Sequence, residues 1–305
     1  MKFLTFVFED KQQVGVVVAG ERVLRLGDAW RDGAAPHDVR DLIALGEAGL
    51  QQVRALIESR SRDQALTTPL DAVTILAPIP APRKNVFCIG RNYREHIIEG
   101  NRARGRQTDD FPKVIEVFTK PPTAVIGTGA TIPRHAAVTQ QLDYEIELGL
   151  VIGKAGVNIA REQALDHIFG YTIINDVTAR DLQAAHGQWF KGKGLDRTCP
   201  MGPFVVHRSA IADPHELSLV LEVNGETRQD ANTNDLLFKI EDIIEQLSRG
   251  MTLEVGDIIA TGTPSGVGLG WTPPKFLQSG DVIRARVQGL GELVNMVGPE
   301  SNDVA

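Results

Sequence analysis

The most informative segment of this chain is Leu142-Asp143-Tyr144-Glu145-Ile146-Glu147-Leu148-Gly149-Leu150-Val151-Ile152. Its second half is apolar and partly β-branched, as in a buried strand, whereas its first half alternates acidic and apolar residues. Because strand side chains point to opposite faces with a period of two, Asp143, Glu145 and Glu147 are predicted to share one face. Like charges on one face repel one another, so this strand needs something that offsets them.

A divalent cation would offset these charges most directly, since Mg²⁺, Mn²⁺ and Ca²⁺ all bind carboxylate oxygens. The segment alone is also compatible with a face exposed to water, or with acids that pair with Lys or Arg elsewhere. Asp176 follows the apolar segment 167–174, a predicted strand, and precedes a predicted helix that begins near Thr178. It either caps that helix or supplies a third oxygen ligand beside Glu145 and Glu147.

The composition is that of a water-soluble globular protein, with 305 residues, 42% hydrophobic and 23% charged. A net charge of −7 without a long basic run argues against a nucleic-acid partner. No apolar segment has the length of a membrane span, and the N-terminus begins a strand pattern instead of a signal peptide. Cys88 and Cys199 show no metal-type spacing, so we expect a cytoplasmic protein with reduced thiols.

A proline-rich connector at residues 78–82 divides the chain into two predicted domains. Residues 1–79 form a small N-terminal α/β module of short strands and two helices, without clustered chemistry. In residues 80–305 strands dominate and long helices are few. This pattern predicts an α+β, β-rich fold, a barrel-like roll of mixed sheet, instead of a doubly wound α/β fold. Asn224-Gly225 is a strong signal for a hairpin with a type I′ turn.

A second candidate for chemistry is the pair His96 and Glu99, in a segment (residues 91–99) that suits a short helix. Residues three apart on a helix are neighbours, and a carboxylate beside an imidazole raises its basicity, as a general base requires. Taken alone, such a pair is common and is more often an ordinary surface contact. The following residues 100–110, including Arg104, are polar and arginine-rich and form a candidate lid over a substrate.

Two glycine-containing segments are similar to phosphate-binding loops but lack required parts. Residues 187–193 fit G-x-x-x-x-G-K, yet Gly194 stands where a Ser or Thr is needed, and no strand precedes them. Residues 262–268 follow a predicted strand, but no helix follows and Pro264 interrupts them. We expect the first segment to let Lys193 reach an anionic substrate. In the second, the amides and the Thr263 hydroxyl are expected to contact a carboxylate or keto oxygen.

Six motifs in order resemble the fumarylacetoacetate hydrolase (FAH) family, over residues 84–297. Each motif is weak alone, but six in the same order are specific. They are Gly90-Arg91-Asn92-Tyr93 with His96, Asp143-Tyr144-Glu145-x-Glu147, Asn175-Asp176-x-Thr178-Ala179-Arg180-Asp181-x-Gln183, Gly192-Lys193 with Asp196, Pro200-x-Gly202-Pro203, and Gly262-Thr263-Pro264-x-Gly266-Val267-Gly268.

The resemblance implies a metal site and a fold. Glu145, Glu147 and Asp176 are similar to the three family carboxylates that bind Mg²⁺ or Mn²⁺, and Asp143 would be a neighbour outside the ligand set. The implied fold is the FAH-type roll, a mixed β-sandwich that serves as the catalytic domain. A homodimer is implied as well.

The resemblance also implies catalytic and substrate-binding residues. His96 and Glu99 are similar to the family dyad that activates water, carried on a lid helix. Lys193 is similar to the lysine that stabilises developing negative charge. The longer segment 101–110 departs from the most compact family members and changes the expected lid. Substrate contacts are implied at Arg91, Tyr93, Lys120, Gln183 and Thr263.

The implied reaction is hydrolysis of a C–C bond in a 2,4-dioxo acid, an acylpyruvate such as fumarylpyruvate. A cation would bind the carboxylate and keto oxygens, the His96–Glu99 pair would activate water, and pyruvate would leave as a metal-bound enolate. The same site could serve an isomerase, a hydratase or an oxaloacetate decarboxylase that acts on a 2-oxo or 2-hydroxydienoic diacid in aromatic catabolism. A non-catalytic, metal-stabilised binding protein is the alternative of another class.

Overall fold

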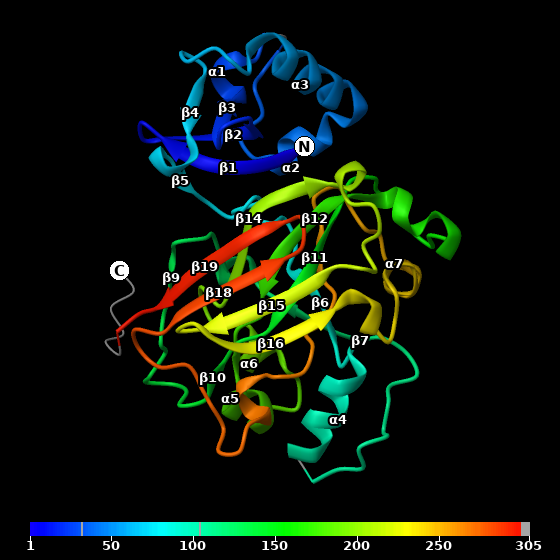
Figure 1. Ribbon diagram of the computed structural model, residues 1–305. Coiled ribbons are helices and arrows are strands. Elements are labelled where there is room, and N and C mark those ends of the chain that lie inside the picture. The colour runs from blue at the N-terminus through cyan, green and yellow to red at the C-terminus, as the bar shows by residue number, and fades with distance from the viewer. Residues whose placement is uncertain (32, 104, 300–305) are drawn as a thin grey trace.

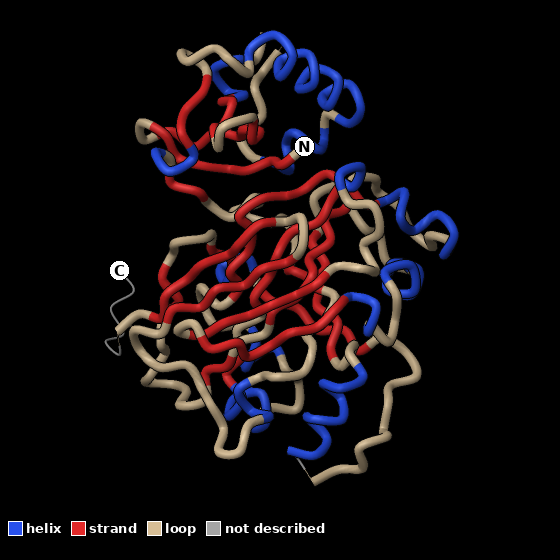
Figure 2. Tube along the Cα trace, viewed as in Figure 1, coloured by secondary structure: helices blue, strands red, loops and turns tan. Residues whose placement is uncertain are grey.

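The computed structural model describes residues 1–31, 33–103 and 105–299. It is a strand-rich α+β structure with two large, open sheets that pack together and a third sheet of two short strands, and helices lie at its edges (Figures 1 and 2). The α+β, β-rich fold class predicted from the sequence is therefore confirmed. Arg104, part of the predicted lid, lies outside the described residues. None of the described helices is long and apolar enough to cross a membrane.

The N-terminal residues form a small lobe at the top of Figure 1, built from a meander of strands and three helices. Antiparallel pairing of the first two strands places the apolar residues Phe3, Phe6 and Val16 in the interior. The elements are β1 (Lys2–Phe8), β2 (Lys11–Val18), β3 (Arg22–Arg25), α1 (Leu26–Ala29), α2 (Val39–Ala44), α3 (Gly46–Arg60), β4 (Thr67–Pro69) and β5 (Thr74–Ile75).

The large sheet continues from this lobe into the rest of the molecule in the order β4-β3-β2-β1-β14-β12-β11-β17-β6-β7. Two short strands join it at its sides, where β5 pairs with β1 and β8 pairs with β14. Its further strands are β6 (Val86–Gly90), β7 (Glu116–Lys120), β8 (Val125–Ile126), β11 (Ile146–Ile152), β12 (Ile168–Asn175), β14 (Cys199–His207) and β17 (Ile258–Ala260).

A second sheet, in the order β16-β15-β18-β19-β9, lies across the middle of the large one (Figure 1). Asn224 and Gly225 both have positive φ, 53° and 81°, as a type I′ turn requires, so the predicted hairpin is confirmed. The strands are β9 (Thr131–Ile132), β15 (Ser218–Val223), β16 (Glu226–Asn232), β18 (Val282–Val287) and β19 (Gly291–Val297).

The remaining helices are short and mostly link strands. They are α4 (Arg94–Ala103), α5 (Arg180–Ala185), α6 (Phe190–Lys193) and α7 (Ile240–Ser248), with 3-10 turns η1 (Leu70–Ala72), η2 (Pro122–Ala124), η3 (Arg161–His167), η4 (Arg208–Ala210), η5 (Thr233–Asp235) and η6 (Gly268–Gly270).

The acidic segment is not one continuous strand, which corrects the sequence prediction. It is divided into β10 (Leu142–Asp143), which pairs with β13 (Thr178–Ala179), and β11 in the large sheet. Glu145 lies in the break between β10 and β11. Asp143 therefore does not share a strand face with Glu145 and Glu147, because its backbone belongs to a different ladder.

Pairing of β1 with β14 joins the N-terminal lobe to the large sheet. The lobe shares a hydrophobic core with one face of that sheet, in which Phe3 packs with Phe169 at 5.6 Å between ring centroids. A second core lies between the two sheets, with Leu148 and Leu221 among its buried residues. The domain boundary at residues 79–80 stays a prediction.

Candidate metal centre and active site

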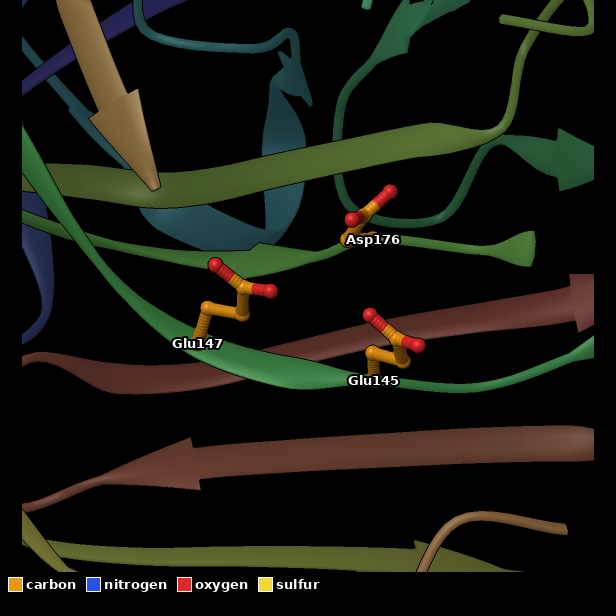
Figure 3. A group of neighbouring side chains, drawn as sticks. All are labelled: Glu145, Glu147 and Asp176. Atoms are coloured by element: carbon orange, nitrogen blue, oxygen red, sulfur yellow. The ribbon is translucent and has the colours of Figure 1, made fainter. Parts of the chain in front are cut away.

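Three carboxylates converge in the interior, and their ligand atoms all lie within 4.8 Å of one another. Figure 3 shows Glu145 and Glu147 side by side and Asp176 on a neighbouring segment, with all three carboxylates facing the same space. Their exposed fractions are 3%, 1% and 0%. Among the described residues, this is the only group of three or more His, Cys, Asp or Glu side chains with such geometry.

The pairing of β11 with β12 brings these residues together. Ile146 is opposite Asn175 in the antiparallel register, so Glu145 and Asp176 flank the same end of the ladder. The Glu145 amide donates to Asn175 Oδ1 over 2.9 Å, and the Asp176 amide donates to the Glu145 carbonyl over 2.8 Å. Glu147 follows two residues later, on the same side as Glu145. The backbone therefore fixes all three ligand positions.

Three buried cations surround the carboxylates. Lys193 Nζ lies 2.7 Å from Glu145 Oε2 and 2.6 Å from Asp176 Oδ2. Arg180 Nη2 lies 2.7 Å from Glu145 Oε1, and Lys120 Nζ lies 2.8 Å from Asp176 Oδ1. Pairing of these acids with Lys and Arg, which the sequence left open, is therefore partly realised.

The cations do not serve the three carboxylates equally. Burial raises the pKa of Glu145, but Lys193 and Arg180 outweigh it and lower that pKa to about 2. For Glu147, burial and the charges of Asp176 and Glu145 raise the pKa well above its usual range. Glu147 thus lacks an adequate positive partner among the described side chains. An all-carboxylate donor set with one uncompensated member fits a hard divalent cation.

Glu145 and Glu147 of the cluster line a pocket of about 660 Å³, whereas Asp176 is buried behind its wall and is not a lining residue. His96, on α4, lines this pocket together with Glu145, Glu147 and Lys193. His96 Nδ1 lies 3.5 Å from Glu99 Oε2, and this nitrogen has no hydrogen-bond partner among the described residues. The structure therefore brings His96 and Glu99 together beside the carboxylate cluster, at ion-pair distance.

The helix that carries His96 begins later than predicted, at Arg94 instead of residue 91. Arg91 has a φ of 51°, which breaks the helical path. Asn92 fixes the next turn, since its side-chain amide donates to the carbonyls of Thr261 and Phe238 over 2.8 and 3.1 Å.

Of the five predicted substrate contacts, Arg91, Gln183 and Thr263 line the pocket. Tyr93 and Lys120 are 1% and 0% exposed and are not among its lining residues. Lys120 instead lies behind Asp176 and donates to the carbonyls of Val177 and Lys193. Lys120 therefore supports the proposed ligand Asp176 instead of contacting substrate. Its place at the end of β7 does not show in the sequence which of these two roles it has.

Comparison of the chain with known proteins identifies its family. The model of the fumarylacetoacetate (FAA) hydrolase C-terminal family matches residues 85–298. The chain belongs to the fumarylacetoacetate hydrolase family. It is 47% identical over 307 residues to the oxaloacetate tautomerase YisK of Bacillus subtilis strain 168, covering 98% of this chain and 100% of that relative. FAH-family enzymes typically bind a divalent metal, and the buried carboxylate cluster is where one could bind here.

Two solved structures of the family show the same fold over nearly the whole chain. The fumarylacetoacetate hydrolase of the psychrophile Exiguobacterium antarcticum has a TM-score of 0.79 and 41% identity, and the match covers 98% of this chain and 99% of that one. The maleylpyruvate hydrolase of Sphingobium sp. SYK-6 has a TM-score of 0.75 and 31% identity, with the same coverage. The chain therefore has the fold of FAH-family enzymes. The relatives named here are two hydrolases and a tautomerase, so the family fold does not by itself define the reaction.

Sequence reasoning assigned no role to three residues at this family site. Arg180 is 5% exposed and contacts Glu145, and its place in one of the six motifs is the signal that could have found it. Phe118 and Trp189 form one wall, with ring centroids 5.6 Å apart. Trp189 packs on Gly90, where a Cβ would lie 2.4 Å from the indole ring. The alternating pattern of β7 could have indicated which face Phe118 is on, but not that this face lines the pocket. The sequence around Trp189 carries no such signal.

Proposed function

We propose that this protein is a divalent-cation-dependent tautomerase that interconverts the keto and enol forms of oxaloacetate or a closely related 2-oxo diacid. The observation that carries this proposal is a histidine, His96, that lines one pocket with Glu145 and Glu147, two carboxylates of the cluster that Asp176 completes. Tautomerisation moves one proton between carbon and oxygen, so it needs a base near the carbon and positive charge near the oxygen. The 47% identity to an oxaloacetate tautomerase supports the choice of substrate.

Glu145, Glu147 and Asp176 are the proposed ligands for Mg²⁺ or Mn²⁺. When bound, the cation supplies Lewis-acid polarisation of the substrate's oxo group. The donor set does not distinguish Mg²⁺ from Mn²⁺, since both prefer carboxylate oxygens. Lys120 supports the Asp176 ligand from behind the cluster.

The chain's own side chains supply the proton transfer in this proposal. His96 takes the proton from the carbon beside the oxo group, and Glu99 stabilises the resulting imidazolium from 3.5 Å. Lys193 adds positive charge where the oxygen becomes negative, because it already lies between Glu145 and Asp176. His96 then transfers this proton to the oxygen and becomes neutral again, so that atoms and charge balance. Arg91, Gln183 and Thr263 remain the proposed substrate contacts on the pocket wall.

Hydrolysis of an acylpyruvate is the second candidate, and the shape of the pocket favours it. A volume of about 660 Å³ exceeds what a four-carbon diacid fills, and the Phe118–Trp189 wall could accept a longer unsaturated acyl group. In this reaction the His96–Glu99 pair takes a proton from water, which attacks the distal carbonyl. The C–C bond breaks, and pyruvate and a carboxylic acid are released. A structural relative is a maleylpyruvate hydrolase.

The test measures the ultraviolet absorbance of the oxaloacetate enol as it decays, with Mg²⁺ or Mn²⁺ and with excess chelator. We expect the protein to accelerate the decay, and the chelator to remove that acceleration. Product analysis on a panel of fumarylpyruvate, acetylpyruvate and an unsaturated seven-carbon diacid runs beside it. An enol decay that the protein does not change, together with release of pyruvate and a free acid, would replace the first proposal with the second. No turnover with chelator-sensitive stability would favour the non-catalytic binding protein.

Homodimeric assembly and a role in aromatic-compound catabolism stay predictions from the sequence resemblance, and a cytoplasmic location stays the prediction drawn from the two cysteines. The first of these has a direct test, since light scattering of the purified protein should give twice the 33.2 kDa mass of one chain. A mass of one chain at micromolar concentration would contradict the predicted homodimer. It would leave the proposed reaction untouched, because every residue assigned to it lies in one chain.

A further inference from the structure

The glycine-rich loop over residues 262–270 uses its backbone amides to bind carboxylates of its own chain. Gly262 N donates to Oε2 of Glu147 over 2.7 Å. Gly266 N lies 3.1 and 3.2 Å from the two carboxylate oxygens of Glu99, on α4. Backbone amides in such turns form concave anion-binding sites. One loop therefore contacts both a proposed cation ligand and the acid of the proposed base pair, whereas the sequence predicted that these amides bind substrate.

Asp143 connects the same loop to a second ligand. Its Oδ1 accepts from Gly268 N over 2.6 Å, and its Oδ2 accepts from Leu269 N over 3.0 Å and from Arg180 Nε over 2.8 Å. Arg180 Nη2 in turn lies 2.7 Å from Glu145 Oε1. All the side chains in this path are buried, so water does not compete for their contacts.

Helix α4 reaches the loop by close packing at Gly270. A Cβ at that position would lie 2.1 Å from Glu99 Oε1, so any larger residue would displace the acid. Ile97 is buried on the same helix, whereas residues 105–115, which follow it, form neither helix nor strand. The helix also buries Gly100 and Asn101, and Glu99 is the described α4 side chain that reaches the loop's amides.

We propose that Asp143 and Arg180 are positioning residues that link cation occupancy at Glu145 and Glu147 to the docking of α4 on the loop. The proposal rests on the cation site of the proposed function, not on its reaction. A bound cation fixes both ligand carboxylates, and these hold the loop directly and through Arg180 and Asp143. A fixed loop presents Gly266 N to Glu99, which keeps His96 over the pocket. By linkage, docking of α4 strengthens cation binding by the same factor.

Hydrogen exchange of the α4 amides, with and without saturating Mn²⁺, tests the link in the full-length protein. In the unchanged chain Mn²⁺ should slow exchange over residues 94–103. In Asp143→Asn, calorimetry should show that Mn²⁺ still binds, with lower affinity. Mn²⁺ should then slow exchange in α4 clearly less than in the unchanged chain, because only the direct contact of Glu147 with Gly262 remains. The control is Asp230→Asn, an exposed acid on β16, which should behave as the unchanged chain.

A second variant keeps the test valid if the loss of Asp143 prevents folding. Gly270→Ala touches no proposed ligand, but it displaces Glu99. It should leave α4 exchanging fast with Mn²⁺ bound and weaken Mn²⁺ affinity within the roughly 5- to 150-fold range of such couplings. Equal protection of α4 by Mn²⁺ in the unchanged chain and Gly270→Ala would overturn the link, as would Mn²⁺ binding without protection in the unchanged chain. These experiments measure hydrogen exchange and Mn²⁺ binding, not turnover. The link can therefore hold or fail independently of whether the protein is a tautomerase.

Discussion

The carboxylate cluster and helix α4 hold the two halves of the candidate site in different ways. Glu147 lies on β11, and Glu145 and Asp176 lie just outside the paired ends of β11 and β12, where hydrogen bonds of their amides hold them. His96 and Glu99 stand on a ten-residue helix, and Glu99 meets the body of the protein through one loop amide. A sheet ladder resists displacement of any single residue, whereas a short helix outside the sheets, with three buried residues, can dock and release.

The carboxylate cluster and α4 are thus suited to different tasks, cation binding and proton transfer. The cluster is fully buried and organised before any substrate arrives, which suits a site that must retain a cation. The His96 and Glu99 side chains are 15% and 19% exposed, and His96 lines the pocket. We therefore expect changes in the cluster to remove cation binding and activity together, and changes in α4 to reduce activity while the cation stays bound.

The largest effect is expected for Glu147→Ala. Activity should fall by more than about 10³-fold, because a ligand of the polarising cation is lost. Calorimetry should detect no Mn²⁺ binding, and the melting temperature without cation should not fall, since Glu147 is the least compensated acid of the cluster. Glu162→Ala, an exposed acid on η3, is the matched control. Turnover that survives in Glu147→Ala would remove the metal assignment.

The next largest effect is expected for His96→Ala. Loss of a general base should lower kcat by about 10²- to 10⁴-fold, and Mn²⁺ affinity should change little, because His96 contacts no proposed ligand. The control is His37→Ala, an exposed histidine in the N-terminal lobe. If oxaloacetate turnover persists but acylpyruvate hydrolysis disappears, His96 activates water and does not abstract the substrate proton.

A smaller effect on activity, with a clear effect on stability, is expected for Lys120→Met. Removing one partner of a buried pair should cost about 3–5 kcal/mol of unfolding free energy, measured by urea denaturation. Mn²⁺ affinity should fall by about 10- to 100-fold, as for other residues that support metal ligands. Lys191→Met, exposed on α6, controls for the loss of a lysine. A raised KM with unchanged cation affinity would restore the predicted substrate contact.

The smallest effect is expected for Gly90→Ala, which alters the pocket wall alone. Its Cβ would meet the Trp189 ring and push the indole toward the pocket, and tryptophan fluorescence should report the shift. We expect kcat/KM for an acylpyruvate with a bulky acyl group to fall about tenfold, the scale of one misfitted carbon group. Oxaloacetate turnover is the internal control. Equal losses of kcat/KM for both substrates would mean that the aromatic wall does not select for the acyl group.

The sequence by itself determined most strands, the hairpin at Asn224-Gly225 and the family, because these depend on local periodicity, turn chemistry and motif order; the break between β10 and β11 is the exception. It also indicated Glu145 and Glu147 as neighbours, since two residues apart on a strand is a local relation. Asp176 could be assigned as their partner only through the family resemblance, because its own neighbours in the chain suit a helix cap equally well.

Only the tertiary structure decided which groups meet these residues. Asp143 has the same local pattern as Glu145, yet its backbone joins another ladder and it pairs with Arg180. Lys120 was expected to face substrate, but β7 carries it behind Asp176. The loop amides bind protein carboxylates that lie more than a hundred residues away along the chain. Contacts of this kind depend on how separate strands pack, and no local pattern of side chains encodes that packing.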